Sequence, residues 1–203
     1  MKTDIKTLEE TLKANEFAIT AEIPAPISAS ASEMEEKIDL LAGHVHAINV
    51  TDNPGATAHM SSLAGCSIVR NKGIDPIFQV TCRDRNRLAI QSDLMGASAL
   101  GINNVLTLAG DPIKNGDQPE AKAVFDVNSK KILSIMQSMN DLGETMSGRK
   151  LQTKSSFFPG GAAIIHEPEN NWDPKALKDK VAHGAKFIQT QFCYDVDLLR
   201  DYM

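Results

Sequence analysis

The sequence has few cysteines and no paired-cysteine motif. Three cysteines occur among 203 residues, at positions 66, 82 and 193, and none of them forms a CxxC pair. This odd, widely spaced set argues against a disulfide scaffold and against a cysteine-rich zinc site. We therefore expect a reducing compartment, most simply the cytoplasm.

Long apolar runs and clusters of basic residues are also lacking. No segment approaches the roughly 20 consecutive apolar residues of a membrane-spanning helix, and the N-terminus carries acidic residues where a signal peptide has an apolar stretch. The 21 Lys and Arg residues are outnumbered by 26 Asp and Glu residues, which gives a net charge of −5. Because phosphate contacts need clustered Lys and Arg, we expect no nucleic-acid partner and no membrane span.

Several familiar catalytic motifs are absent. No GxSxG, HExxH or Walker A sequence occurs, and no GxGxxG turn follows the first predicted strand. A serine hydrolase, a zincin, a P-loop enzyme and a Rossmann dinucleotide fold are therefore without support. His44 and His46 lie before or at the start of a predicted strand with no evident third ligand, so we expect no metal site.

Short β-branched or aromatic runs alternate with longer amphipathic segments, a pattern typical of βα units on a parallel sheet. The predicted strands are 18–23, 46–51, 76–81, 104–108, 155–158 and 186–190. The predicted helices are 7–14, one opened by a capping box between Ser32 and Glu35, 56–69, 85–100, 129–142 and 174–183. Glycines at 73, 101, 143 and 184 are expected to end four helices in a left-handed conformation.

Polar strand ends recur at intervals of about 30 residues, the length of one βα unit in a (β/α)8 TIM barrel. An open doubly wound sheet has βα units of similar length, but the glycine-rich turn expected after its first strand is absent from this sequence. One longer step contains PIKNGDQPEAKAVFD, which we expect to be an inserted active-site loop. Six units fit in the chain and a barrel needs roughly 60 more residues. We therefore predict that residues 1–203 form a single but incomplete TIM-barrel domain, truncated or completed by a partner.

Two carboxylates are predicted at the mouth of this barrel, where side chains at the carboxyl ends of parallel strands meet. Glu22 follows the apolar run FAITA. Burial there would favour the protonated form that a general acid needs, but a surface position just beyond the strand fits equally well. Asp111 follows the fourth predicted strand, 104–108, in the segment LAGDP. This segment could contact a ligand or form a simple turn. Gly110 would let the backbone approach a ligand closely.

Other polar residues follow the remaining strands, and each has two interpretations. Thr51, Asp52 and Asn53 could bind a ligand or form a turn. Gln79 shares a strand face with Thr81, and the following RDR could be site residues or a solvated helix start. The segment FFPGGAA could hold a flat ligand or be a bare loop. Gln189 and Gln191 alternate with apolar residues, and an amide that offers both a donor and an acceptor suits a heteroaromatic ligand.

Taken together, these segments resemble the methylenetetrahydrofolate reductase family. The matching stretches, in chain order, are AEIPAP, INVTDNP, TCRDRNRLAIQSDLMGASALGINNVLTLAGD, QPEAKAVFD, FFPGGAA and GAKFIQTQFCYD. They cover nearly the whole chain, and the stretch from CRDRN to LAGD is the most specific. The sequence is more similar to the branch found in bifunctional and acetogen-type enzymes than to the best-known enteric branch.

The resemblance implies an FAD-containing TIM barrel that reduces 5,10-methylenetetrahydrofolate to 5-methyltetrahydrofolate by hydride transfer from reduced flavin, in one-carbon and methionine metabolism. Glu22 matches the general acid that assists opening of the folate's five-membered ring. Asp111 matches a catalytic aspartate close to both flavin and pterin, and Gln191 matches a glutamine that contacts the pterin.

The same resemblance assigns residues to FAD. Thr51 and Gln79 match flavin-contacting positions, Gly110 and Asp111 lie beside them, and Asp173 and Lys180 match the contacts to adenosine and phosphate. The sequence departs from some relatives at Ala109, where they have Arg, and at Asp179, where they have a basic residue. The electron donor, NADH, NADPH or a reduced redox partner, stays open. Relatives commonly self-associate, so a homo-oligomer or a redox partner subunit is expected.

Two other functions remain as alternatives. The chain could be a non-catalytic flavin-binding fragment or accessory subunit of such a reductase. It could also be an unrelated TIM-barrel lyase or aldolase, although no Lys stands at a strand end to form a Schiff base.

Overall fold

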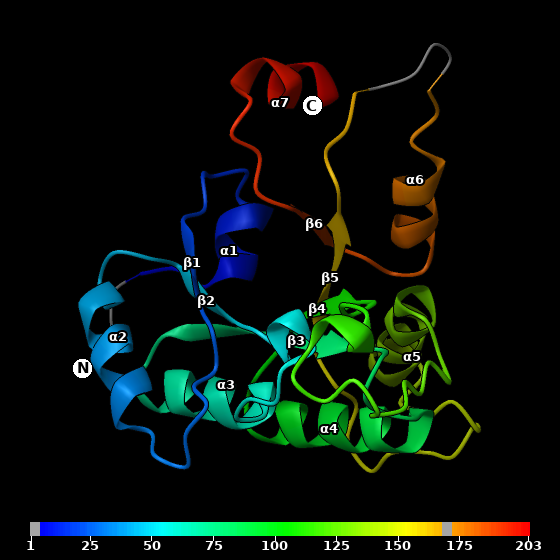
Figure 1. Cartoon of the computed structure of the whole chain (residues 1–203). Coiled ribbons are helices and arrows are strands. Elements are labelled where there is room, and N and C mark those ends of the chain that lie inside the picture. Colours follow the sequence, from blue (N-terminus) through cyan, green and yellow to red (C-terminus); the bar gives the residue numbers. More distant parts are fainter. Residues whose placement is uncertain (1–4, 168–171) are drawn as a thin grey trace.

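A computed structural model describes residues 5–167 and 172–203, in which strands and helices alternate (Figure 1). The strands are β1 (Thr20–Ile23), β2 (Ala47–Val50), β3 (Asp75–Thr81), β4 (Asn104–Leu108), β5 (Phe158–Ala163) and β6 (Phe187–Thr190). The helices are α1 (Leu8–Lys13), α2 (Ser32–Leu41), α3 (Ser62–Asn71), α4 (Arg87–Ala99), α5 (Ser129–Asp141), α6 (Lys175–Ala182) and α7 (Val196–Tyr202), with short 3-10 turns η1 (Pro54–Ala56) and η2 (Ile113–Asn115).

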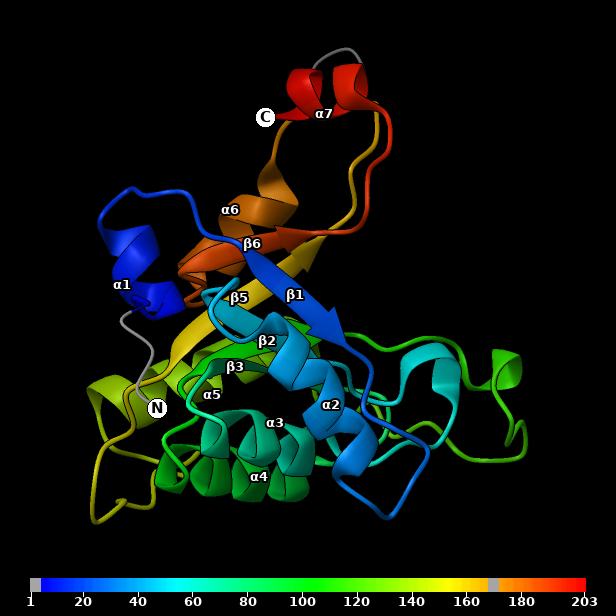
Figure 2. The ribbon, with the colours of Figure 1, turned by 90° about the vertical axis from the view of Figure 1, so that its left-hand side faces the viewer.

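The six strands form one parallel sheet in the order in which they occur along the chain. The sheet curls, and α2, α3 and α4 lie along its outside (Figure 2). Its end strands, β1 and β6, both line one cavity, so the curl brings the two edges towards each other. The prediction of an α/β fold with consecutive parallel strands is confirmed. The described residues form a half-barrel, consistent with an incomplete TIM barrel rather than a closed eight-stranded one.

Apolar side chains pack on both faces of the sheet. On the outer face, Ile48, Phe78 and Val80 join the main core with residues from the helices. On the inner face, Leu8 of α1 packs with Ala47, Ile77 and Leu106 (the last two from β3 and β4). Helix α1 also donates a hydrogen bond from Leu8 N to Asp75 Oδ2 at 3.0 Å. Thus α1 plugs the amino end of the half-barrel, which leaves the carboxyl ends of the strands for polar side chains.

Most predicted elements agree with the structure to within a few residues, and β4 has the predicted bounds. The predicted glycine ends at 73, 101, 143 and 184 are confirmed, because all four residues have positive φ. The predicted strand at 155–158 was wrong, since β5 begins at Phe158 and includes the Pro-Gly-Gly segment that resembled a loop. Gly160 is required there, because an added Cβ would lie 2.2 Å from a ring carbon of Phe187.

One predicted helix cap and one predicted helix start were also wrong. No side-chain cap forms at Ser32, because that residue is already helical and the N-cap is Ala31. A capping box instead opens α1, where Thr7 and Glu10 bond reciprocally. Helix α3 starts at Ser62 rather than at residue 56, since residue 56 ends the 3-10 turn η1 and Ser61 caps the helix by accepting a hydrogen bond from Ala64 N.

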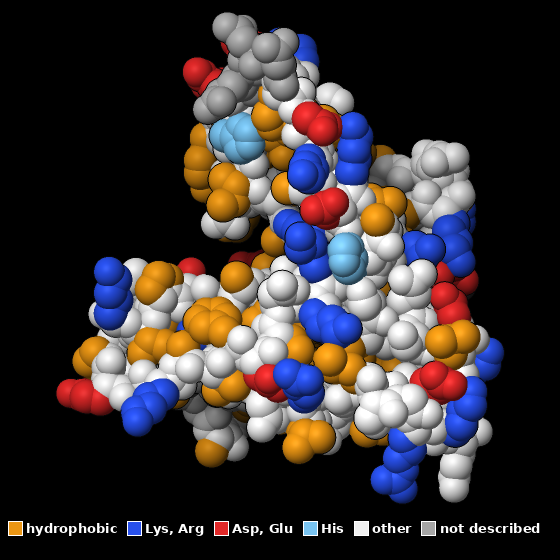
Figure 3. Space-filling model, turned by 90° about the vertical axis from the view of Figure 1, so that its right-hand side faces the viewer, with side chains coloured by type: hydrophobic (Ala, Val, Ile, Leu, Met, Phe, Trp, Pro, Cys, Tyr) orange, Lys and Arg blue, Asp and Glu red, His pale blue; other side chains and the backbone are white. Residues whose placement is uncertain are grey.

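Two parts extend from the half-barrel. The segment that carries α7 stands apart at the top of Figure 1, and the space-filling view shows a hollow between this part and the broader lower body (Figure 3). The predicted inserted loop follows β4, and Val124 N and Phe125 N bond to the carbonyl oxygens of Arg83 and Cys82. None of the described helices has the length and apolar character to cross a membrane.

Candidate functional site

Three neighbouring cavities lie at the carboxyl ends of the strands. The β1–β6 cavity, of about 230 Å³, lies between the two edge strands. The central cavity, of about 270 Å³, lies over the ends of β2, β3 and β4. The α6 cavity, of about 450 Å³, lies between β4, β5 and α6. Gln191 lines the first two cavities and Leu108 and Ala109 line the last two, so adjoining cavities share walls.

Each residue that the sequence assigned to catalysis or ligand binding lines one of these cavities. Glu22 lines the β1–β6 cavity and Gln191 lines both this cavity and the central one. The central cavity also holds Thr51, Gln79, Gly110 and Asp111, and the α6 cavity holds Asp173 and Lys180. The fold therefore brings together, at one end of the sheet, side chains from nearly the full length of the chain.

Thr51 and Gln79 present polar groups to the central cavity. Thr51 directly follows β2, is 6% exposed, and has a buried Oγ1 without a hydrogen-bond partner among the described residues. Gln79 in β3 is also buried, and its Nε2 donates to Glu22 Oε2 at 3.0 Å. Gln79 thus connects the two cavities, whereas the Thr51 hydroxyl has no partner among the described residues.

Glu22 lies in the edge strand β1 and is exposed. Its carboxylate is in contact with solvent and is not enclosed by apolar side chains, and it lies within the strand rather than just beyond it. The hydrogen bond from Gln79 nevertheless gives the carboxylate a fixed partner at the cavity. This bond occupies Oε2, so Oε1 is the oxygen that can serve a ligand.

Asp111 is exposed at the mouth and held by the backbone of the loop after β2. Gly55 N donates to Asp111 Oδ2 at 2.8 Å. The preceding residue, Gly110, has φ of 94°, and an added Cβ would lie 2.9 Å from Arg83 Cβ. Glycine is thus needed for this close packing, and the carboxylate of Asp111 is positioned by a fixed backbone donor.

Arg83 is the buried centre of a network beneath Asp111. It is 1% exposed, and its guanidinium donates to the carbonyl oxygens of Asp111 at 3.1 Å and Asn53 at 3.0 Å. It also forms a two-point ion pair with Asp84. Burial pushes the pKa of Asp84 upward, but hydrogen bonds from Arg83 and Asn53 outweigh it and lower the pKa. The RDR segment is therefore not a solvated helix start; it joins the loops after β2, β3 and β4.

Asp52 and Asn53 are engaged within the protein and are poorly placed to bind a ligand. Asp52 Oδ2 accepts hydrogen bonds from Thr81 N at 2.7 Å and from Thr81 Oγ1 at 2.9 Å, and it also pairs with Arg85. Asn53 donates to Asp84 and accepts from His59 N, both at 3.1 Å. Of the three polar residues after β2, only Thr51 keeps an unpaired polar atom at a cavity.

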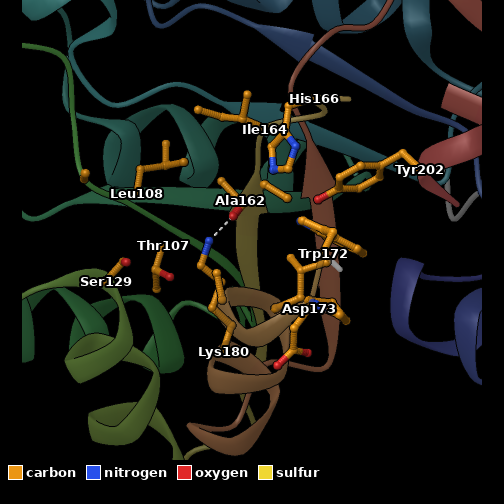
Figure 4. Close-up of a pocket in the computed structure, with 15 residues that line it drawn as sticks. Thr107, Leu108, Ser129, Ala162, Ile164, His166, Trp172, Asp173, Lys180 and Tyr202 are labelled. Carbon is orange, nitrogen blue, oxygen red and sulfur yellow. Dashed lines mark hydrogen bonds between the residues drawn. The ribbon is translucent and has the colours of Figure 1, made fainter. Parts of the chain in front are cut away.

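The α6 cavity combines a lysine with an aromatic wall. Lys180 reaches in from α6 and donates to the carbonyl oxygen of Ala162 (Figure 4). Burial, and then nearby Lys130, lower its pKa. His166, Trp172 and Tyr202 gather on the side away from Thr107 and Ser129 (Figure 4), with the Trp172 and Tyr202 rings 5.6 Å apart.

Asp173 and Asp179, which lie in or beside the segment that forms this cavity, are already paired with lysines. Asp173 pairs with Lys178 at 2.8 Å, and Asp179 pairs with Lys130 at 3.4 Å. Because Asp179 pairs with Lys130, it does not pair with Lys180, whose side chain lines the α6 cavity. A lysine next to aromatic rings is suited to a ligand with both a phosphate and a flat ring.

Sequence analysis missed three features of this region. Asn49 lines the β1–β6 cavity, and counting back two residues from Thr51 along the strand would have identified it as facing inward. The buried role of Arg83 has no such signal, since a charged triplet after a strand usually marks a loop. The aromatic cluster joins segments that are distant in the sequence, so no local sequence pattern predicts it.

Among the described residues, no group of three or more His, Cys, Asp or Glu side chains could hold a metal ion.

Comparison with known proteins identifies the family of the chain. The profile of the family described as methylenetetrahydrofolate reductase matches residues 7–203. The chain belongs to this family. Two relatives from Schizosaccharomyces pombe (strain 972 / ATCC 24843) carry the family name. Methylenetetrahydrofolate reductase 1 is 28% identical over 179 residues, which cover 86% of this chain and 28% of the relative. Methylenetetrahydrofolate reductase 2 is 28% identical over 146 residues, which cover 70% and 22%.

A solved structure has a similar fold. It is an uncharacterized protein from Clostridium thermocellum that binds two copies of 5-methyl-5,6,7,8-tetrahydrofolic acid. The TM-score is 0.63 at 14% identity, and the match covers 96% of this chain and 62% of that one. The chain thus spans less than a third of the two fission-yeast reductases and less than two thirds of the similar structure.

Proposed function

We propose that the chain reduces 5,10-methylenetetrahydrofolate to 5-methyltetrahydrofolate, with FAD as its cofactor. The observation that carries this proposal is the shared wall at Gln191. This glutamine lines both the cavity with Glu22 and the cavity with Asp111. A ligand against Gln191 would therefore have one carboxylate on each side, as expected for a folate that is protonated at one end and oriented at the other.

Glu22 is assigned the role of general acid. Because Gln79 Nε2 donates to Oε2, the proton to be transferred is placed on Oε1. Protonation of folate N10 as the bond from N10 to the methylene carbon breaks leaves the electron pair on N10 and an iminium between N5 and that carbon. The carbon is then electrophilic and can accept a hydride.

Asp111 is assigned to orientation of the folate and to the flavin side of the site. Gly55 N holds Oδ2 and the Arg83 guanidinium holds the backbone carbonyl of the same residue. A carboxylate fixed in this way can accept hydrogen bonds from ring N–H groups without moving, which lowers the entropic cost of binding.

The residues present fit FAD. Thr51 Oγ1 is buried beside the central cavity without a partner among the described residues, as a hydroxyl kept for a cofactor would be. Lys180 could bind a phosphate in the α6 cavity, next to aromatic side chains that suit an adenine ring. Gln79, Gly110 and Asp173 complete the proposed contacts. When bound and reduced, the flavin supplies the hydride.

The remaining details of the proposal concern the cellular setting. NADH, NADPH or a reduced redox partner would reduce the cofactor, and the product would feed methionine biosynthesis in the cytoplasm. Membership of the bifunctional and acetogen-type branch, and assembly with a second copy or a redox subunit, belong to the same proposal.

The alternative is a non-catalytic flavin-binding fragment or accessory subunit. It is favoured by one observation, the exposure of Glu22 on the edge strand β1. Both versions predict a yellow protein with flavin absorbance when the chain is loaded with FAD.

Anaerobic mixing of the photoreduced, FAD-loaded chain with methylenetetrahydrofolate distinguishes the two. Reoxidation of the flavin with formation of 5-methyltetrahydrofolate supports the enzyme. A flavin that stays reduced supports the non-catalytic alternative, and a chain that binds no FAD overturns the cofactor assignment.

A further inference from the structure

The inner face of the half-barrel becomes polar one layer above its apolar plug. Ala47 packs with Leu8 in the inner core. Two residues further along the same strand, Asn49 faces the same side, and its backbone is paired in register with Glu22 of β1. Asn49 therefore lies directly beside the proposed general acid.

The carboxamide of Asn49 is buried and incompletely bonded. The residue is 2% exposed, and its Oδ1 has no hydrogen-bond partner among the described residues. A buried acceptor without a donor destabilises a fold, because it loses its bonds to water and gains none in return. A buried, unsatisfied polar group of this kind calls for an explanation, and a role in ligand binding is one.

Other buried amides among the described residues are bonded. Asn104 Nδ2 donates to Asp75 Oδ2 at 2.8 Å and to the carbonyl oxygen of Pro76 at 3.0 Å. Gln91 donates to the carbonyl oxygen of Arg87 at 2.9 Å and accepts from Met146 N at 2.7 Å. The orphan oxygen of Asn49 is therefore a local feature of the β1–β6 cavity and not a general property of the core.

We propose that Asn49 is a binding residue for the pterin ring of the reduced folate. The cavity that it lines also contains Glu22, Gln189 and Gln191, whereas the flavin-assigned Thr51 lines the central cavity instead. A carboxamide presents an acceptor next to a donor. The lactam edge of a pterin, with N3–H beside the 4-oxo group, presents the complementary pair.

This inference rests on the proposed function, and it predicts a trade of stability against binding. In Asn49→Leu a similarly branched apolar side chain replaces the orphan carboxamide. The unfolding midpoint in urea is expected to stay unchanged or rise, while the dissociation constant for 5-methyltetrahydrofolate rises at least tenfold and that for FAD stays within twofold. Asn49→Ala, which cannot overpack the site, is expected to weaken folate binding to the same extent.

Asn104→Leu is the matched control, because it removes a buried carboxamide that is bonded. Its unfolding midpoint is expected to fall, and its affinity for 5-methyltetrahydrofolate is expected to stay close to that of the unaltered chain while it remains folded. The opposite signs in stability separate a binding amide from a structural one.

Titrations of the FAD-loaded chain with 5-methyltetrahydrofolate, and of the apo chain with FAD, decide the matter. Equal folate affinity in the unaltered chain and both Asn49 variants overturns the inference and leaves the proposed function standing. Weakened FAD binding with unchanged folate binding also overturns it, since Asn49 then belongs to the cofactor. Failure of the unaltered chain to bind folate overturns both the inference and the proposed function.

Discussion

The guanidinium of Arg83 donates a hydrogen bond to the backbone carbonyl oxygen of Asp111 at 3.1 Å, from a side chain that is 1% exposed. The same guanidinium reaches the carbonyl oxygen of Asn53, which precedes the loop residue, Gly55, that binds the Asp111 carboxylate. One buried cation therefore holds both the backbone of Asp111 and the loop that orients its side chain.

Replacement of this cation should affect stability and the site together. Arg83→Met leaves two carbonyl oxygens without their donor and removes the ion-pair partner of Asp84, which keeps its hydrogen bond from Asn53. Loss of one partner of a buried pair costs about 3–5 kcal/mol. We expect a loss of about 3 kcal/mol in urea unfolding. Arg87→Met is the control, since the Arg87–Asp126 pair is more exposed and far smaller losses are expected. Equal losses in the two variants would show that Arg83 is not the buried anchor.

Glu22→Gln removes the proposed acid while keeping the shape of the side chain. We expect turnover of methylenetetrahydrofolate to fall by about 10²–10⁴-fold, the range for a lost general acid. FAD binding and reduction of the flavin by its donor should persist, because Glu22 lines the β1–β6 cavity and not the α6 cavity. Stopped-flow measurement of the two half-reactions checks this. Loss of bound flavin would contradict a purely chemical role.

Asp111→Asn keeps an oxygen that can accept the hydrogen bond from Gly55 N but removes the negative charge. A hydrogen bond to a charged group contributes about 1.5–3 kcal/mol, so folate turnover is expected to fall about tenfold to a hundredfold. The unfolding midpoint should change little. Turnover equal to that of the unaltered chain would remove Asp111 from the site.

The pH dependence of stability should reveal the pair between Arg87 and Asp126. Hydrogen bonds from the Arg87 side chain and backbone hold the pKa of Asp126 at about 2. An unfolded Asp has a pKa of about 3.9, so the folded protein binds this proton more weakly. The stability conferred by ionised Asp126 is therefore complete above the unfolded pKa and is lost as pH falls from about 4 to about 2.

The measurement compares urea unfolding of the unaltered chain and of Asp126→Asn over this pH range. The unaltered chain should be more stable at pH 7, and the difference should shrink below pH 4. A difference that is independent of pH down to pH 2 would contradict the assignment.

The sequence predicted the order of the strands and the residues at their carboxyl ends because both depend on local patterns. Period-two alternation and a unit length of about 30 residues place Thr51, Gln79 and Asp111 at one mouth without knowledge of contacts. These same patterns cannot tell a buried charge from a solvated one, so the role of Arg83 was missed. Strand β5 was misplaced because Gly160 is required by its close contact with the Phe187 ring on the neighbouring strand, and a local sequence pattern does not reveal such a tertiary contact.

The curl of the sheet has a mechanical consequence for the β1–β6 cavity. Its two walls are the ends of the sheet, so the distance from Glu22 to Gln191 accumulates over the five strand pairings that connect β1 to β6. The separation of these two side chains is therefore expected to depend on every strand pairing in the sheet. A side chain at position 160, which would disturb the pairing of β5 with β6, is expected to change the distance between Glu22 and Gln191.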